Sequence, residues 1–198
     1  MKKIVITGGP CGGKTSAIRA LEQEFNGRLL VVPEAATLLL SGGFPVPGRD
    51  VDWSQNWQDA FQAAVTKLQH SLEQAYQLIA DQRGITLLIC DRGLLDGAAY
   101  TPGGRPAFAR RYGVKIRKTM QEYESVIHLE SLATAQPELY GQGNNEHRFE
   151  PLAEAQALEG RTRAAWSGHR CHLIIENKSG LKTIISAVIE TVRARLSD

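Results

Sequence analysis

The segment ITGGPCGGKTS, residues 6–16, decides the fold, because a glycine-rich turn joins an apolar stretch to a stretch with helical periodicity. From Gly8 to Thr15 it fits the pattern GxxxxGK[ST], which has meaning where a strand precedes it and a helix follows it. Glycines let backbone amides turn toward an anion, and the positive N-terminal end of the following helix points to the same place. The sequence therefore predicts a loop that wraps the phosphates of a nucleoside triphosphate.

The side chains of this loop predict ATP and Mg²⁺ as its ligands. Lys14 follows the glycines and can reach the β and γ phosphates, while the Thr15 hydroxyl is placed to bind magnesium. Cys11 is interpreted as a small side chain at a turn position, without chemistry of its own. The residues expected to surround the nucleotide are Gly8, Gly9, Pro10, Cys11, Gly12, Gly13, Lys14, Thr15 and Ser16.

Short apolar runs alternate with helical stretches along the whole chain, which is typical of an α/β fold with a parallel sheet. The runs read as nearly continuous hydrophobic residues, so helices should cover both faces of the sheet. The expected strands are 3–7, 29–32, 86–90, 126–129 and 172–175. The expected helices are 14–25, about 53–82, 105–124, 150–166 and 181–196.

Composition limits the classes of protein that remain. The 198 residues, with 42% hydrophobic and 22% charged side chains, predict one domain over 1–198. A net charge of +2 is too small to indicate a nucleic-acid partner, and the three cysteines show no metal or disulfide spacing. Because the cysteines show no disulfide framework, we expect a location in the reducing cytoplasm. No stretch is long and apolar enough to suggest a membrane span. Within the domain we expect a substrate-side region at about 41–82 and a lid at about 132–165.

Acidic residues follow two of the predicted strands. Asp91 ends the third apolar run, at the sheet edge beside the phosphate loop, where a carboxylate could hold magnesium. Arg92 could stabilise charge on the transferred group, or it could form a salt bridge with a neighbouring helix. Glu34 follows the second run and is our candidate general base; the alternative is that it caps the helix after it.

Four segments together resemble a known family: GGPCGGKTS, VVPEAA, DRGLLDGAAY and NNEHRFE, at 8–16, 31–36, 91–100 and 144–150. They are similar to the P-loop proteins labelled AAA that are related to nicotinamide riboside kinase domains and, more loosely, to the deoxynucleoside kinases. The resemblance implies a three-layer P-loop NTPase sandwich of the nucleoside and nucleotide kinase type, with strand order 2-3-1-4-5.

The same resemblance implies roles for individual residues. Glu34 would serve as the base, Arg92 would hold the acceptor end, and Arg148 would be a lid arginine. Gln62 would face a nucleoside-like acceptor. The DRG triplet stands where deoxynucleoside kinases commonly show a serine, so the identity of the acceptor stays open.

Two functions compete at this point. The first is a small-molecule kinase that transfers the γ-phosphoryl group of ATP to a hydroxyl, using Lys14, Glu34, Asp91, Arg92 and Arg148. The second is a nucleotide-dependent ATPase or GTPase switch that acts on a protein or anionic membrane partner. A kinase requires an enclosed acceptor pocket beside the general base. The basic stretch 105–118 is interpreted as a solvated helix face, with an anionic partner as the alternative. The choice between ATP and GTP and the oligomeric state stay open.

Overall fold

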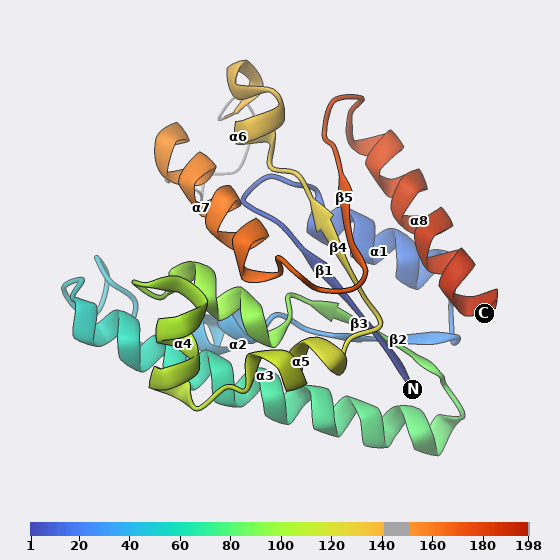
Figure 1. Cartoon of the computed structure of the whole chain (residues 1–198), viewed down its shortest axis with the longest axis horizontal. Coiled ribbons are helices and arrows are strands. Elements are labelled where there is room, and N and C mark those ends of the chain that lie inside the picture. The colour runs from blue at the N-terminus through green and yellow to red at the C-terminus, as the bar shows by residue number, and fades with distance from the viewer. Residues whose placement is uncertain (141–150, 198) are drawn as a thin grey trace.

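Five parallel strands form the central sheet of the protein (Figure 1). A computed structural model describes residues 1–140 and 151–197 of the chain. The strands are β1 Lys2–Thr7, β2 Leu29–Val32, β3 Leu87–Asp91, β4 Ser125–Leu129 and β5 His172–Ile175. Their order in the sheet is β2-β3-β1-β4-β5, which confirms the order that the resemblance implied.

Helices cover both faces of the sheet and make three layers (Figure 1). On one face lie α1 Lys14–Glu24 and α8 Leu181–Ser197. The other face is covered by α3 Gln55–Arg83, the 3₁₀ helix η1 Leu94–Tyr100, α4 Gly104–Tyr112, α5 Ile116–Gln121 and α7 Leu152–Ala165. Three short elements, α2 Ala35–Ser41, α6 Leu132–Ala135 and η2 Pro137–Leu139, lie in the connections.

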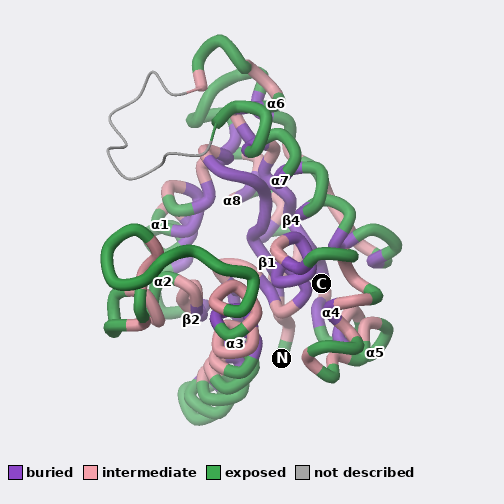
Figure 2. The backbone as a smooth tube through the Cα atoms, turned by 90° about the vertical axis from the view of Figure 1, so that its left-hand side faces the viewer, coloured by how far each residue is buried: buried purple, intermediate pink, exposed green. Residues whose placement is uncertain are grey.

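Alternate residues of each strand point to opposite layers, so one apolar run serves two cores. In β1, Ile4 and Ile6 pack in the cluster formed with α1 and α8, whereas Val5 packs in the cluster formed with α3, η1, α4 and α7. All three side chains are 0% exposed. Figure 2 shows the consequence, with buried strands at the centre and exposed backbone along the outer side of α3. The expected strand pattern is therefore confirmed, together with its physical reason.

The long helix α3 and the loop before it are fixed by local contacts. Ser54 is the N-cap of α3, where its hydroxyl accepts a hydrogen bond from the Trp57 amide. The Trp57 ring stacks on Phe61 with ring centroids 5.0 Å apart, and Phe44 lies tilted 5.2 Å from Phe61. The Trp57 indole also donates to Pro45 O at 2.8 Å. These contacts hold the glycine- and proline-rich loop over the first turns of α3.

The expected helix over 105–124 is wrong as a single element. Gly113, with φ at 70°, ends α4 in a left-handed conformation, and α5 begins after a short break. Tyr123, at the end of the predicted helix, is instead buried beside Trp166. In the described part of the chain, no helix combines the length and the apolar character that a membrane crossing requires.

Candidate functional site

The glycine-rich loop connects β1 to α1 and lies on the end of β4. Gly8 has φ at 130°, and a Cβ built on it would lie 2.0 Å from Leu129 O. A Cβ on Gly12 would approach the same oxygen to 2.7 Å. The close approach of two backbones therefore requires glycine at both positions.

The lysine of the loop is turned inward and buried. Lys14 Nζ donates to Gly8 O at 3.0 Å and to Gly9 O at 2.6 Å, and the residue is 8% exposed. Residues 11–16 line a cavity of about 900 Å³ together with 177–181 and residues of α6. A nucleotide is within the size range that such a cavity holds. Of the predicted phosphate-binding residues, 11–16 therefore line one cavity, whereas 8–10 are not part of its wall.

Arg92 is the centre of the neighbouring group of charges. Its Nε donates to Glu34 Oε1 at 2.6 Å, and its Nη1 lies 3.4 Å from Gly8 O and 3.6 Å from Asp96 Oδ1. The structure thus brings together the end of β2, the end of β3 and the phosphate loop. The alternative prediction of a salt bridge for Arg92 is confirmed in part, because Arg92 forms an ion pair with Glu34, the residue that precedes α2.

The backbone of Arg92 adopts a left-handed conformation, with φ at 67°. Such a conformation costs free energy for a residue with a side chain and persists where its surroundings hold it. Here the Arg92 amide donates to Ile6 O at 3.1 Å, and Gln69 Nε2 donates to Arg92 O at 3.2 Å. Gln69 also donates to Glu73 Oε1 at 2.9 Å. Helix α3 therefore helps to hold the backbone of Arg92 in this conformation.

Glu73 holds the Gln69 side chain that contacts Arg92, and it was not predicted from the sequence. It is 4% exposed, pairs with Lys3 Nζ at 3.0 Å and accepts the Tyr123 hydroxyl at 2.8 Å. Tyr123 in turn accepts the Leu94 amide at 3.1 Å. A glutamate on the apolar face of a long helix was the available signal, since a buried carboxylate requires partners.

The two carboxylates beside Arg92 have pKa values that are shifted in opposite directions. Burial raises the pKa of Glu34, but Arg92, the Thr37 hydroxyl and Lys14 outweigh it and hold that pKa below its ordinary value. Burial and the neighbouring charge of Glu34 raise the pKa of Asp91 from 3.8 to about 6. Arg92 and Lys14 lower the pKa of Asp91 as well, but they do not outweigh burial there, so Asp91 is less fully compensated by cations than Glu34 is. A divalent cation would supply the charge that Asp91 lacks, so an oxygen ligand here fits Mg²⁺.

A second cavity lies between α2, α3 and η1, beside Glu34 and Arg92. Its volume is about 320 Å³, and Phe61, Gln62 and Tyr100 contribute to its wall. Gln62 is 5% exposed, and within the described residues its Oε1 has no hydrogen-bond partner. A buried carbonyl oxygen without a partner is costly, so Gln62 keeps an unused hydrogen-bond acceptor next to this cavity.

Asp96 joins this cavity to the core and was also missed from the sequence. It is 3% exposed, and its side chain accepts the Thr7 hydroxyl, the Gly93 amide at 2.8 Å and the Trp166 indole at 3.1 Å. A second acid within DRGLLDG was the signal that could have identified it. Its role is to fix the turn that follows Arg92.

One comparison with known proteins identifies the family. A family model described as an AAA domain matches residues 3–183. The chain belongs to the AAA-domain family. No curated protein matches this AAA-domain chain. The family and the loop geometry make it a P-loop nucleotide-binding protein, while the narrower relation to nicotinamide riboside kinase domains stays a prediction.

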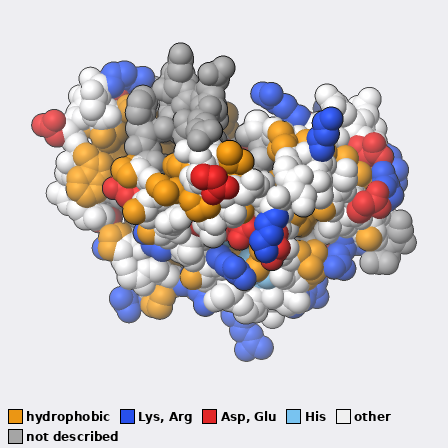
Figure 3. Space-filling view, turned by 90° about the horizontal axis from the view of Figure 1, so that it is seen from above, with side chains coloured by type: hydrophobic (Ala, Val, Ile, Leu, Met, Phe, Trp, Pro, Cys, Tyr) orange, Lys and Arg blue, Asp and Glu red, His pale blue; other side chains and the backbone are white. Residues whose placement is uncertain are grey.

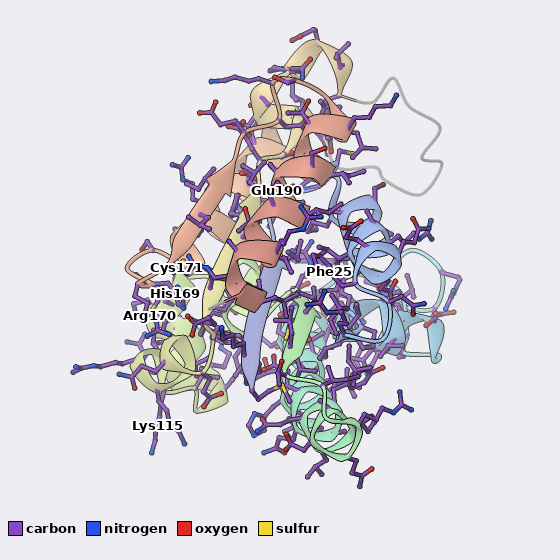
Figure 4. The ribbon with its side chains drawn as sticks, turned by 90° about the vertical axis from the view of Figure 1, so that its right-hand side faces the viewer. Phe25, Lys115, His169, Arg170, Cys171 and Glu190 are labelled. Carbon is purple, nitrogen blue, oxygen red and sulfur yellow. The ribbon has the colours of Figure 1, made fainter. Side chains whose placement is uncertain are left out.

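Two predicted features of this AAA-domain protein remain, Arg148 and the basic stretch 105–118. Arg148 lies outside the described residues. The basic stretch 105–118 falls on α4 and α5, where Arg111 pairs with Asp59 and Lys115 extends away from the body of the molecule (Figure 4). Seen from above, acidic and basic side chains are interspersed over the surface (Figure 3). The face in that view is therefore not an extended basic surface.

Glu34 precedes α2 without capping it through its side chain. It is the N-cap residue of that helix, yet its side chain makes no capping hydrogen bond. Its two carboxylate oxygens instead accept from Arg92 Nε and from the Thr37 hydroxyl, each at 2.6 Å. The capping alternative therefore does not account for the position of this carboxylate.

Proposed function

We propose that this AAA-domain protein is a small-molecule kinase, which transfers the γ-phosphoryl group of Mg·ATP to a hydroxyl of a nucleoside-like or other small acceptor. The observation that carries the proposal is the 320 Å³ cavity beside Glu34, on the other side of Arg92 from the phosphate loop. A switch that activates water has no need of such a cavity, whereas a kinase must enclose its acceptor.

On the nucleotide side, the loop amides and Lys14 would hold the triphosphate, and Thr15 and Asp91 would hold Mg²⁺. Lys14 lies at the loop carbonyls, within reach of phosphates bound there. The cation, when bound, neutralises charge on the β and γ phosphates. The raised pKa of Asp91 supports this assignment, because the carboxylate gains a positive partner when the metal binds.

On the acceptor side, Glu34 is the general base. It accepts the proton of the acceptor hydroxyl while the oxygen forms a bond to the γ-phosphorus and the bond from that phosphorus to the β-phosphate oxygen breaks, releasing ADP. The low pKa of Glu34 means that it is ionised and ready to accept a hydrogen bond at neutral pH. Arg92 stands between base and phosphate loop, where its charge stabilises the transferred group.

Gln62 is assigned to recognition of the acceptor, because the residue lines a cavity with aromatic and polar walls and its buried amide oxygen has no partner among the described residues. A heterocyclic amide or imino N–H would satisfy it, which supports a nucleoside-like acceptor. By resemblance, Arg148 acts from the lid at about 132–165. The substrate-side region at about 41–82 carries Gln62 on α3.

The test is ADP release from Mg·ATP in the presence of a panel of nucleosides, nicotinamide riboside and sugars. The kinase proposal requires one acceptor to raise ADP release well above the basal rate. Lys14→Ala and Glu34→Gln should both abolish that increase, and Glu22→Gln, an exposed change on α1, should not. A slow basal rate that depends on Lys14, ignores Glu34 and responds to no acceptor would instead identify a nucleotide-dependent switch.

A further inference from the structure

A buried carboxylate from α7 lies against the phosphate loop. Glu159 is 5% exposed, and its Oε2 accepts the Gly9 amide at 2.6 Å. Its Oε1 lies 2.6 Å from His128 Nε2, on β4, so each carboxylate oxygen has its own partner. A Cβ built on Gly9 would come within 2.5 Å of Glu159 Oε2. A larger residue at the second position of the loop would therefore have to displace the Glu159 carboxylate.

The next residue of the loop is bound to a different helix. The Ser131 hydroxyl donates to Pro10 O at 2.5 Å and also caps α6 by accepting the Ala133 amide at 3.2 Å. Two consecutive loop residues, Gly9 and Pro10, are thus tied to α7 and α6. These ties fix the first part of the loop, while the later residues 11–16 line the nucleotide cavity.

The Gly9 amide is directed to a protein carboxylate and is therefore not a phosphate donor in this conformation. An anion beside a triphosphate site would by charge alone oppose binding. Glu159, however, has a hydrogen-bond donor at one oxygen and the imidazole of a buried histidine at the other, and such partners offset its charge. Burial raises the pKa of Glu159, but His128, the Gly9 amide and Lys14 bring it below its ordinary value. The carboxylate is thus held as an ionised acceptor for the loop.

We propose that Glu159 is a positioning residue for the phosphate loop, which fixes the Gly9 amide so that the following amides and Lys14 face the triphosphate. Because Glu159 belongs to α7, the affinity for nucleotide then depends on the position of that helix. The geometry of the hydrogen bond, rather than the negative charge, carries the effect. This proposal concerns nucleotide binding and holds whether or not an acceptor is phosphorylated.

Two variants separate geometry from charge. Glu159→Gln keeps the reach of the side chain and an oxygen that can accept the Gly9 amide, but removes the charge. Glu159→Asp keeps the charge but shortens the side chain, so that the Gly9 amide loses its partner. Glu154→Gln, an exposed change on the same helix, is the matched control. Binding is measured by titrating a fluorescent ATP analogue in the presence of Mg²⁺, with no acceptor.

Wild type, Glu154→Gln and Glu159→Gln should bind the analogue with affinities within about threefold of one another. Glu159→Asp should bind it roughly tenfold more weakly, because one buried donor is left unpaired. The Gly9 amide proton gives a direct readout in an assigned ¹⁵N spectrum. Its resonance should lie downfield in wild type and Glu159→Gln and shift upfield in Glu159→Asp. Equal affinity of Glu159→Asp and wild type, or a larger loss in Glu159→Gln than in Glu159→Asp, would overturn the proposal.

Discussion

Replacing Asp91 by asparagine should stabilise the metal-free protein and, at the same time, remove the carboxylate that we assign to Mg²⁺. The pKa of Asp91 is raised from 3.8 to about 6, chiefly by burial and then by the charge of Glu34. A folded-state pKa above the unfolded value means that the folded protein binds the proton more tightly. Stability therefore falls as the pH rises through the interval from about 4 to about 6 and stays low above it.

The magnitude follows from the size of the shift. A difference of about two units corresponds to about 3 kcal/mol between the two protonation states. Asparagine cannot ionise, so Asp91→Asn should raise the free energy of unfolding by about 3 kcal/mol at pH 8 and by about 1.5 kcal/mol at pH 5. Mg·ATP should stabilise wild type more than the variant, because the metal offsets the charge of Asp91. The gain in stability should accompany loss of Mg²⁺-dependent turnover.

The assay is urea unfolding followed by tryptophan fluorescence, at several pH values, in buffer with a chelator. Asp81→Asn, which alters an exposed carboxyl on α3, is the control and should change stability little at any pH. A variant that is no more stable than wild type at pH 8, or a gain that does not vary with pH, would refute the reasoning. Either result would mean that Asp91 is compensated in the folded protein.

Three further substitutions test other parts of the site. Gly8→Ala should lower the melting temperature and abolish nucleotide binding, because its Cβ would lie 2.0 Å from Leu129 O. A thermal melt with and without Mg·ATP measures both effects, and a normal ligand-induced shift in melting temperature would contradict the prediction. Gln62→Leu should leave stability unchanged or raise it slightly, since a buried unpaired oxygen is lost. The same change should raise the KM for the acceptor about tenfold and leave the KM for ATP unchanged. Unchanged acceptor kinetics would remove Gln62 from recognition. Glu73→Gln should cost about 2 kcal/mol of unfolding free energy, because Lys3 loses the closer of its two charged partners, at 3.0 Å, and keeps Glu122 at 3.7 Å. Chemical denaturation measures this change, and an unchanged midpoint would count against the support we describe for Arg92.

Prediction from sequence succeeded where the decisive interactions are local. The phosphate loop is read from consecutive residues, and the apolar runs predict strands because each β-strand residue reports on one layer. It failed where distant residues meet. Glu73 and Lys3 are 70 positions apart, and Glu159 and Gly9 are 150 apart, so no local pattern relates them.

The break between α4 and α5 was missed for a different reason. Gly113 lies within a stretch that is otherwise charged and helical in composition, and glycine inside a helix lowers its stability without forbidding it. Only the packing of Phe108 and Tyr123 against the sheet shows that the chain must turn there. The site roles of Arg92 and Glu34 were proposed from their places after strands, and their direct ion pair could not have been predicted without the structure.

The separation of the two cavities has a consequence for how this protein could diversify. Among the described residues, none lines both the 320 Å³ cavity, drawn from 34–100, and the 900 Å³ cavity, drawn from 11–16 and 132–184. Substitutions that reshape the first would leave the walls of the second intact. If the protein is the kinase that we propose, a lineage built on this sheet could change its acceptor through one contiguous stretch of its gene, while its phosphoryl donor stays the same.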